Sequence, residues 1–529
     1  MKKALTAALA CLLAMACLAT GAAAIEETKE VAPDMRFITY EEYGAAGDGE
    51  TDDFDAIIAA HEAANAADLP VRACKGAVYY IGASDKTAVI QTFTDWSGAR
   101  FIIDDAQVAE KNYGCAVFHV ASKLAPVPVT GVTALKKNQE KLELDLPMPN
   151  GAVILVYDST TMRFIREGAN QNDGTAQTDV IVVDKDGNVD MRAPIVWDYD
   201  TITSITAYPM DEGTLTVRGG HFITVANQPE TDAPPYCSRN IRVTRSNVVI
   251  DGVLHDVTGE TDKGAPYNGF IVAWNCANVT VQNCQFSGHR IYKYIGSAGT
   301  LVERGTYDIN ASSVANLTYK NCTQRNDMLD ENLWGVMCSC FCKNLEFDGC
   351  ALSRFDAHMG VANATVRNSV VRAFSVTGFG LLLVENTKKI GSSFISLRPD
   401  YGSFWDGEIV IRNCEFVTSG KTPSLIYAEN SGLHDFGYPC MMPRKITVDG
   451  LVIDDRDHPP FYLGPYIFDK SPASFPLFRE ASPFPYASTR EVDIKGLTVK
   501  SGRFLLRDTH WYTFSLWDVK VNRGWGGMG

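Results

Sequence analysis

Short stretches that alternate apolar and polar residues recur through the second half of the chain. Examples are "NVTVQNCQF" from Asn278, "NLTYKNCTQ" from Asn316, "EIVIRNCEF" from Glu408 and "KITVDGLVI" from Lys445. Each unit holds two short strands separated by a tight Asn or Gly, and no helical periodicity lies between the units. The units recur at intervals of about twenty to about forty-five residues, which is typical of a solenoid. The pattern therefore predicts a β-solenoid.

The residues at the corners of these units support stacking of successive coils. Asn and Gly tolerate the left-handed backbone that a sharp corner needs, and stacked Asn side chains can hydrogen-bond from coil to coil. Cysteine fills the same position after the corner in four units: Cys284, Cys322, Cys350 and Cys414. Because cysteine behaves as a small buried hydrophobe, we interpret these residues as an inward stack and not as disulfides.

A second group of cysteines lies in "CSCFC", where Cys338, Cys340 and Cys342 alternate with other residues. In a strand, alternate side chains share a face, so we expect all three on one side. Zinc binding is the sharper alternative for this triplet. It is disfavoured because a second supporting pair of ligands is missing nearby.

The segment "YGAAGDGETDDFDAIIAAHEAA", Tyr43 to Ala64, begins with a glycine-rich turn and continues into an amphipathic helix. Thr51 to Asp53 would cap that helix, and the helix would cover the open end of the solenoid. The segment resembles the opening motif of the pectate-lyase-like superfamily of right-handed parallel β-helix proteins, which includes polygalacturonases and phage tailspikes. The resemblance implies an all-β fold: a right-handed parallel β-helix with an N-terminal capping helix. It does not transfer an activity, because the ordered catalytic elements of polygalacturonases are missing from this chain.

Residues 126 to 245 interrupt the repeats with strand-like runs such as "GAVILVYD", "TDVIVVD" and "GTLTVRGG". They predict a β-rich insertion that forms one wall of a cleft. The expected organisation is a signal peptide at 1–24, the N-terminal cap and first coil at 36–125, the insertion at 126–245, and the main β-helix with its C-terminal cap at 246–529.

The first 24 residues combine two lysines, a short apolar core and small residues before the expected cleavage after Ala24. We therefore expect an exported protein, in the periplasm, at the cell surface or secreted. Lipid attachment at Cys17 is the disfavoured alternative, because Ala14 stands where a leucine is expected. No later stretch is apolar and long enough to cross a membrane. The net charge of −15 argues against a nucleic-acid partner but permits an anionic substrate at a local basic cluster.

The stretch "SRFDAHMG" at 353–360 places Asp356 and His358 on one strand face. Aligning the strands that precede each repeat unit places one polar set outward: Asp308, Asn310, Gly335, Met337, Asp356, His358, Ser396 and Arg398. The same alignment places Trp334, Val336 and Cys338 inward. Asp308 and Asp356 would lie two coils apart, with carboxyl groups roughly 9 to 10 Å from each other. That separation is at the upper edge of the ~6.5–9.5 Å range of inverting glycosidases.

These positions define the candidate site. The predicted catalytic residues are Asp308, Asp356, His358 and, from the acidic loop "RNDMLDEN", Asp327 and Asp330. The predicted substrate-binding residues are Asn310, Arg354, Arg398 and, from "GHRIYKY", His289, Arg290, Lys293 and Tyr294. We expect neither a metal nor another cofactor, and no pattern sets the oligomeric state.

Three functions fit this arrangement. The leading hypothesis is a glycoside hydrolase that acts on a complex polysaccharide through the paired carboxylates. The alternative is a polysaccharide lyase acting on a uronic-acid polymer, with His358 or Lys293 as the base and Arg398 or Arg354 neutralising the substrate carboxylate. The third is a β-helix protein that binds glycans without cleaving them.

Overall fold

The computed structural model describes residues 36–165, 174–295, 299, 301–420, 422–428, 436–469, 486–487, 489–508 and 520–523. The predicted signal peptide, with Cys17, lies outside the described residues. The chain divides into two units, 1–37 and 38–529, and the second unit is described below. No helix of the described residues is long and apolar enough to span a membrane.

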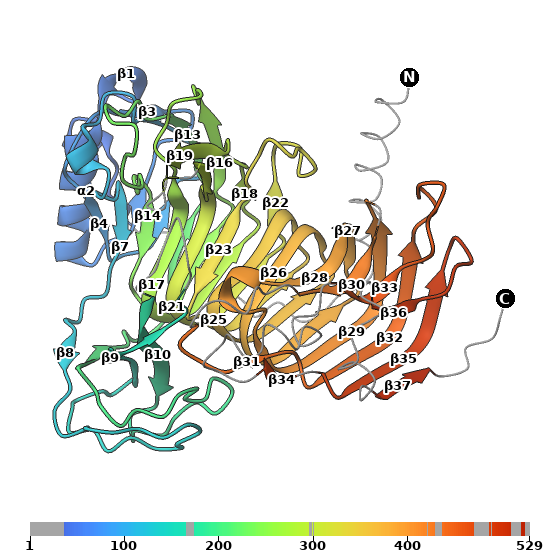
Figure 1. The fold of residues 1–529 in the computed structure, drawn as a ribbon. Helices are drawn as coiled ribbons and strands as arrows, with labels where there is room; N and C mark the ends of the chain where they lie inside the picture. The colour runs from blue at the N-terminus through green and yellow to red at the C-terminus, as the bar shows by residue number, and fades with distance from the viewer. Residues whose placement is uncertain are drawn as a thin grey trace. The chain divides into compact units, whose positions relative to one another are not determined.

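Most strands of the second unit join one sheet that coils into a parallel β-helix (Figure 1). The strands stack in three rows, and a long strand bends at a corner to serve two or three rows. Row one contains β2 (Val71–Arg72), β5 (Thr94–Asp95), β12 (Leu215–Arg218), β15 (Val248–Asp251), β24 (Lys343–Asp348), β37 (Lys520–Arg523), the C-terminal parts of β17 (Asn268–Gln282), β21 (Tyr307–Lys320), β25 (Ala351–Arg367) and β26 (Val370–Glu385), and the N-terminal parts of β29 (Trp405–Thr418), β32 (Lys445–Asp454) and β35 (Glu491–Val499).

Row two contains β1 (Asp48–Asp52), β3 (Val78–Ile81), β6 (Arg100–Asp104), β13 (His221–Val225), β16 (Leu254–Thr258), β18 (Gln285–Phe286), β22 (Thr323–Gln324), β27 (Lys388–Gly391), the N-terminal parts of β25 and β26, and the C-terminal parts of β29, β32 and β35. Row three contains β4 (Ala88–Ile90), β7 (Phe118–Val120), β14 (Ile241–Val243), β23 (Met337–Cys340), β28 (Ser393–Leu397), β30 (Ser424–Tyr427), β33 (Tyr466–Asp469), β36 (Leu506–Asp508), the N-terminal parts of β17 and β21, and the middle of β25 and β26.

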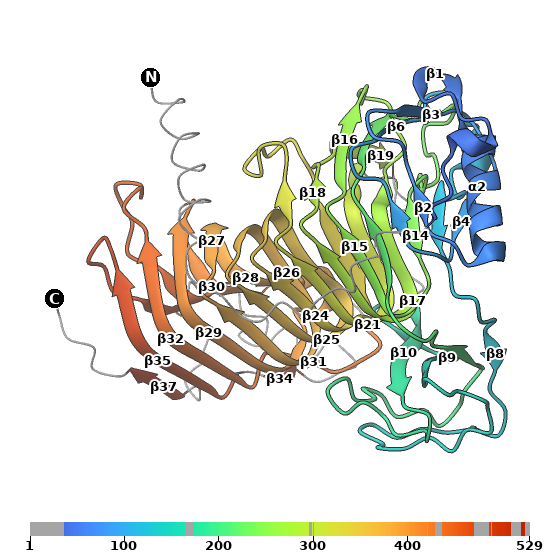
Figure 2. The same ribbon diagram turned by 180° about the vertical axis from the view of Figure 1, so that it is seen from behind.

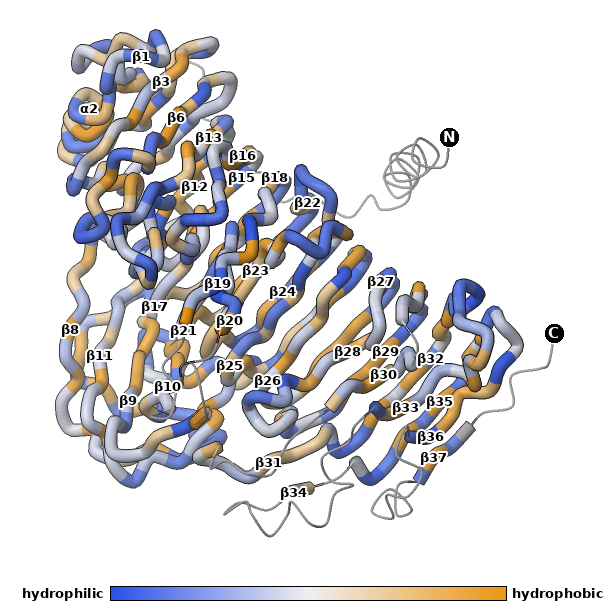
Figure 3. The backbone as a smooth tube through the Cα atoms, turned by 45° about the horizontal axis from the view of Figure 1, so that its top comes forward, coloured by the Kyte–Doolittle hydropathy of each residue, from blue (hydrophilic) through white to orange (hydrophobic). Residues whose placement is uncertain are grey.

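Hydrophobic and hydrophilic residues alternate in short stretches along the strands (Figure 3). The apolar side chains of this alternation fill the interior of the β-helix. The predicted cysteine stack is confirmed, because Cys284, Cys322, Cys350 and Cys414 are all buried in this core. Every cysteine of the described residues is a free thiol. Thiols in these positions act as small apolar side chains that fit the tight turn after each corner.

Positive φ angles of 54° and 53° confirm left-handed corners at Asn283 and Asn321, between the two strands of their units, and a second asparagine stack, which was not predicted, forms at the corner that begins row one. Asn247, Asn278, Asn316 and Asn344 all have positive φ angles between 50° and 59°. The side-chain amide of each of the last three donates to the side-chain oxygen of the residue one coil earlier, at 2.9, 3.0 and 2.7 Å. The left-handed backbone makes the corner, and the amide chain fixes the height of each coil.

The amino-terminal end is covered as predicted by α2 (Phe54–Ala67), which packs against β4 (Figure 2). The preceding glycine turn uses Gly44, Gly47 and Gly49, all with positive φ. Asp53 does not cap the helix with its side chain. It accepts the backbone N–H of Ala46 at 2.6 Å and so fixes the glycine turn instead. Two short 3-10 helices, η1 (Glu41–Tyr43) and η2 (Glu110–Asn112), complete this end.

The insertion forms a separate antiparallel sheet in the order β10-β9-β11-β8, with β8 (Val127–Pro128), β9 (Ala152–Arg163), β10 (Thr175–Val183) and β11 (Ser204–Pro209). It is shorter than the predicted range of 126–245. Strands β12, β13 and β14 fall within that range, yet they pair in parallel with β5, β6 and β7 of the β-helix. Alternation in "GTLTVRGG" is the same in either sheet, so the sequence pattern could not assign β12 to one of them.

The insertion sheet packs on the β-helix through apolar contacts and one buried ion pair. Val153, Leu155 and Val180 contact Ala277 and Ala315 at the corner before row one. Beside them, Lys343 of β24 contacts Asp179 of β10 at 2.6 Å, with both side chains almost fully buried. Burial lowers the pKa of Lys343, but the Asp179 carboxylate keeps the ammonium paired. The insertion is thereby fixed at the corner between row three and row one.

Candidate functional site

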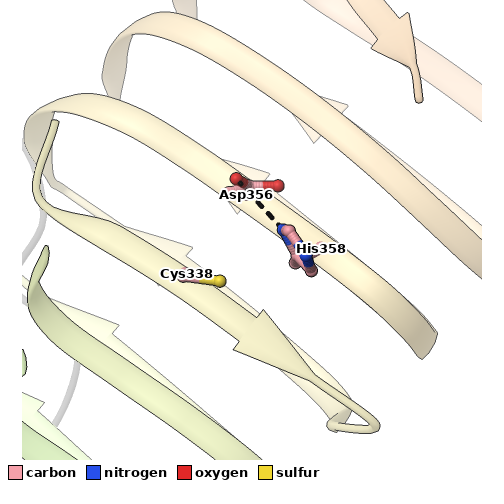
Figure 4. A group of neighbouring side chains, drawn as sticks. All are labelled: Cys338, Asp356 and His358. Atoms are coloured by element: carbon pink, nitrogen blue, oxygen red, sulfur yellow. Dashed lines mark ion pairs between the residues drawn. The ribbon is translucent and has the colours of Figure 1, made fainter. Parts of the chain in front are cut away.

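The candidate site lies on the outward face of row three, around Asp356 and His358 of β25 (Figure 4). Ser339 of β23 pairs with Ala357, so Cys338 lies beside Asp356 on the neighbouring strand. The pairing of β25 with β26 shifts between Ala357 and Val361. His358 lies within β25 at this irregularity, and its ring nitrogens contact Arg398 and Tyr401, which follow β28.

Two arginines hold the Asp356 carboxylate. Arg398, which follows β28, places Nη1 at 3.3 Å from Oδ1, and Arg354 of β25 places Nη1 at 3.3 Å from Oδ2. Arg398 is anchored independently by Asp400, through Nε to Oδ1 at 3.1 Å and Nη2 to Oδ2 at 2.8 Å. Arg354 is anchored by the carbonyl of Trp334 at 3.1 Å and by the Trp334 ring, whose centroid lies 4.6 Å from Cζ. Both guanidinium groups therefore have fixed orientations.

The imidazole of His358 connects this ion pair to Tyr401 of η3 (Pro399–Tyr401). Nη1 of Arg398 lies 2.8 Å from Nδ1 of His358, and Oη of Tyr401 lies 3.2 Å from Nε2. Because a guanidinium only donates hydrogen bonds, Nδ1 is the acceptor. The neutral imidazole consequently carries its proton on Nε2 and donates it to Tyr401.

Solvent reaches this cluster from one side. The Asp356 carboxylate is fully buried, whereas the side chains of Arg354, His358 and Arg398 are 16%, 17% and 17% exposed. Burial would raise the pKa of Asp356, but the charges of Arg398 and Arg354 hold it well below its usual range. Asp356 is therefore an ionised anchor, and the groups that a ligand can touch are cationic or neutral donors.

An aromatic cluster forms the inner wall of the site. Tyr401 packs with Phe341, Phe379 and Phe404 of the β-helix and with Phe164 of the insertion. The insertion therefore borders the site, which supports the predicted wall.

The prediction that Asp308 faces outward beside Asp356 is wrong. The Asp308 carboxylate is fully buried and lies between two histidines, with Oδ1 at 2.6 Å from Nδ1 of His255 and 3.0 Å from Nε2 of His289. Its other oxygen accepts the backbone N–H of Ser287 at 2.8 Å. His255 stacks on Phe270 of the interior core, with ring centroids 3.7 Å apart. The prediction failed because Asp308 lies at the start of β21, next to two buried histidines. Its position there does not follow the alternation of the strand.

The electrostatics of Asp308 are those of a closed ion network. Burial would raise the pKa of Asp308, but His255 and His289 hold it well below its usual range. Burial would lower the pKa of His289, yet its hydrogen bonds with Asp308 and Glu260 raise it to about 10. Nδ1 of His289 lies 3.3 Å from Oε1 of Glu260, so both ring nitrogens face carboxylates. Asp308 and Asp356 thus belong to separate clusters and do not form the predicted pair.

The remaining residues of "GHRIYKY" also have partners within the protein. Arg290 pairs with Asp262, and Lys293 pairs with Glu303 at 3.1 Å across the hairpin of β19 (Tyr292–Ile295) and β20 (Leu301–Arg304). The ring of Tyr294 lies under Arg304, 5.0 Å from its Cζ. With His289 buried, this segment contributes charge pairs at the surface.

The other predicted polar residues lie at the edges of the site. The Asn310 amide donates to the side-chain oxygen of Asn268 at 2.8 Å, on the row that continues to Cys338. Asp327 and Asp330 each accept a backbone N–H of their own loop at 2.9 Å, from Leu329 and Asn332. These contacts make the two aspartates turn-forming residues.

The predicted faces of "CSCFC" are also corrected. Met337 pairs with Ile309 and points into the core, so Cys338 points outward, the reverse of the prediction. Phe341 adopts a left-handed backbone with φ of 52°. After that corner the inward and outward positions of the side chains are exchanged, so Cys342 points into the core again. Alternation holds only within a strand, and an unrecognised corner reverses it.

Cys338, Asp356 and His358 could together hold a metal ion. One ligand atom from each, a thiol sulfur, a carboxylate oxygen and an imidazole nitrogen, lies within 4.8 Å of the others. Sequence reasoning missed this group because it placed Cys338 inside. It also missed Tyr401, although "RPDYG" directly follows the predicted strand, and His255, whose contact with Asp308 depends on the register between coils.

No family model and no curated protein sequence matches this chain. Among solved structures, the tailspike of Pseudomonas phage phi297 is similar in fold, with a TM-score of 0.51 and 15% identity over 89% of this chain and 82% of that one. A tailspike of Pseudomonas phage LKA1 gives a TM-score of 0.49 and 13% identity over 87% and 81% of the two chains. An exopolygalacturonase from Thermotoga maritima gives 0.33 and 10% over 80% and 87%. The likeness to the phi297 tailspike confirms the predicted parallel β-helix fold.

Proposed function

We propose that the protein binds an acidic polysaccharide at Arg354, His358 and Arg398 and cleaves it by β-elimination. One observation carries the proposal: an imidazole and two guanidinium groups, all partly exposed, surround one buried carboxylate at distances of 3.3 to 3.7 Å. Elimination next to a uronic acid needs a base and cations that neutralise the substrate carboxylate. The resemblance of the amino-terminal motif to pectate-lyase-like proteins supports a carbohydrate substrate.

The contacts suggest how a substrate would activate the base. A uronate carboxylate would compete with Asp356 for Nη1 of Arg354 and Arg398. When Nη1 of Arg398 leaves Nδ1 of His358, the lone pair of that nitrogen becomes free to take the proton beside the carboxylate. The C–H bond and the glycosidic C–O bond then break, a C=C bond forms in the product, and the departing oxygen takes a proton from solvent. Asp356 would act as a positioning residue that presents both arginines.

Hydrolysis by paired carboxylates, the leading hypothesis from the sequence, has less support. An inverting hydrolase needs one protonated and one ionised carboxyl group with a water between them. Asp308 and Asp356 are both buried, both have lowered pKa values, and they lie in separate clusters. This pair therefore lacks a proton donor.

The experiment is an assay of the purified protein against a panel of uronic-acid polymers, following the ultraviolet absorbance of the unsaturated product. We expect absorbance to appear with the wild type and to be lost in His358→Gln. His221→Gln is the matched control, because His221 is also a partly exposed histidine on a β-helix strand, and it should retain activity. New reducing ends without absorbance would replace elimination with hydrolysis.

Binding without cleavage is the second candidate function. It is favoured by the internal pairing of the cluster, in which every charge of Asp356 and Arg398 is already compensated. In that case glycan binding would be measurable by calorimetry, would weaken in Arg354→Gln, and no product would form.

A further inference from the structure

We propose that Cys338, Asp356 and His358 form a binding site for a thiophilic divalent metal ion of the zinc class. The three ligand atoms come from neighbouring strands of row three and lie within 4.8 Å of one another before any ion is bound (Figure 4). The proposal does not rest on the proposed function, since metal binding is measured without substrate.

The donor set favours this class of ion. A thiolate, an imidazole nitrogen and a carboxylate oxygen are the three ligand types that zinc takes in proteins, and oxygen-seeking ions such as calcium and magnesium do not use the thiol. Three protein ligands leave one coordination position open. The ligands are also rigidly held, because Cys338 and Asp356 lie on paired strands and each is at most 5% exposed.

Backbone contacts around the ligands fix them further. The carbonyl of Asp356 accepts the hydroxyl of Ser339 at 3.0 Å, and the ring of His358 packs edge-on against Tyr401 with centroids 5.6 Å apart. Such outer contacts orient metal ligands and raise affinity. The site is thus organised in the absence of an ion.

The positive charges of the two arginines oppose the binding of a cation. How strongly they oppose it depends on how firmly each arginine is held beside the ligand atoms. Nη1 of Arg398 now occupies the lone pair of Nδ1 of His358, so an ion that uses this nitrogen must displace it. Because the guanidinium is planar and rigid, Nη1 cannot move alone: either the whole Arg398 group shifts on Asp400, or the His358 ring turns away from it. Arg354 keeps the Trp334 carbonyl. Asp356 has lone pairs enough to hold an ion with one oxygen and an arginine with the other.

Metal binding and elimination would then compete, since both require Nδ1 of His358. A bound ion should lower the rate of elimination, and a uronate ligand should weaken metal binding. If metal binds but no polymer is cleaved, the metal site stands and the proposed function fails; the two results are therefore separable.

The test uses the full-length protein, stripped with a chelator and titrated with Co²⁺ and, separately, with Zn²⁺. We expect a sulfur-to-cobalt charge-transfer band and about one tight zinc per chain by calorimetry. Cys338→Ser should abolish the band, and His358→Gln should weaken binding at least ~10-fold. Cys115→Ser, which alters a partly buried thiol in the first coils, is the matched control and should bind as the wild type does.

Circular dichroism should show that the variants keep the β-helix, and His358→Gln serves if Cys338→Ser fails to fold. A wild type without the charge-transfer band would overturn the proposal. So would a Cys338→Ser variant that retains the band, because the sulfur ligand would then be another thiol.

Discussion

Asp308 and Asp356 are both fully buried, both ionised and both on β-helix strands of the same row, yet their surroundings differ. Asp308 is enclosed by His255 and His289, themselves no more than 2% exposed. Asp356 is held by Arg354 and Arg398, whose side chains reach solvent.

The difference separates a structural carboxylate from a functional one. An anionic ligand would meet Asp356 through its arginines, which are able to exchange one anion for another. Asp308 has no such intermediary, and exchange there would require opening the core. Burial and a lowered pKa are common to both, so accessibility of the partners is the property that distinguishes them.

The largest expected effect is on stability, in Asp308→Asn. Removing the charge leaves His289 buried as a cation with one carboxylate fewer, and breaking a buried pair in this way costs about 3–5 kcal/mol. Urea denaturation should show this loss in the free energy of unfolding. Asp327→Asn, which alters an exposed carboxylate, should stay within about 0.5 kcal/mol of the wild type. An Asp308→Asn variant as stable as the wild type would contradict the structural role.

Asp356→Asn should reverse the pattern, with a large loss of activity and a smaller loss of stability. Misplacing Arg354 and Arg398 should lower the elimination rate on the order of 100-fold, because small errors of position have effects of this size. The arginines can be rehydrated, so unfolding should become easier by only about 1–2 kcal/mol. Product absorbance and urea denaturation measure the two quantities. Equal destabilisation of the Asp308 and Asp356 variants would remove the distinction between them.

The pH dependence of stability should report on the Asp308 network. The folded pKa of His289 is about 10, above its usual 6.5. The stability that it contributes is therefore complete below pH 6.5 and is lost as the pH rises toward 10, by at most about 1.4 kcal/mol per pH unit. Urea denaturation at pH 6, 8 and 9.5 should show the fall. The slope should flatten in His289→Gln, and a wild type whose stability is constant over this range would argue against a charged His289.

The smallest effect is expected for Lys293→Ala. Lys293 pairs with Glu303 across an exposed hairpin, and exposed pairs contribute less than about 1 kcal/mol. Both the elimination rate and the free energy of unfolding should match the wild type. A clear loss of substrate affinity would return "GHRIYKY" to the binding surface.

Much of the fold could be predicted because it depends on local and repeated features. Asn283 and Asn321 mark corners by their tolerance of the left-handed backbone, and Cys284 and Cys322, which follow them directly, mark the inner turn. The extent of the insertion could not be predicted, since β12 has the same pattern as a strand of either sheet. Pairing between distant segments decides it.

The candidate site was predicted in part. Arg354, Asp356 and His358 lie close in sequence, and Arg398 follows a strand of the same row, so alternation brought them together. Asp308 was misplaced because its partners come from other coils and the strand begins irregularly, with a register shift between β17 and β21. Alternation along a strand predicts which face of the sheet a side chain lies on. Whether that side chain is buried depends on which other segments cover the face.

The pairing of β5 with β12 joins residues 94–95 to residues 217–218 across the whole insertion. A chain that emerges from its amino terminus can complete the first two coils, β2 to β4 and β5 to β7, but has no strand to add after β7 until some ninety further residues have followed, about the length of a small domain. The insertion sheet, whose pairings are local, can form during that wait. We therefore expect growth of the β-helix to pause once, after β7, and then to proceed coil by coil. The pause depends on the contact between β5 and β12, which are far apart in the sequence.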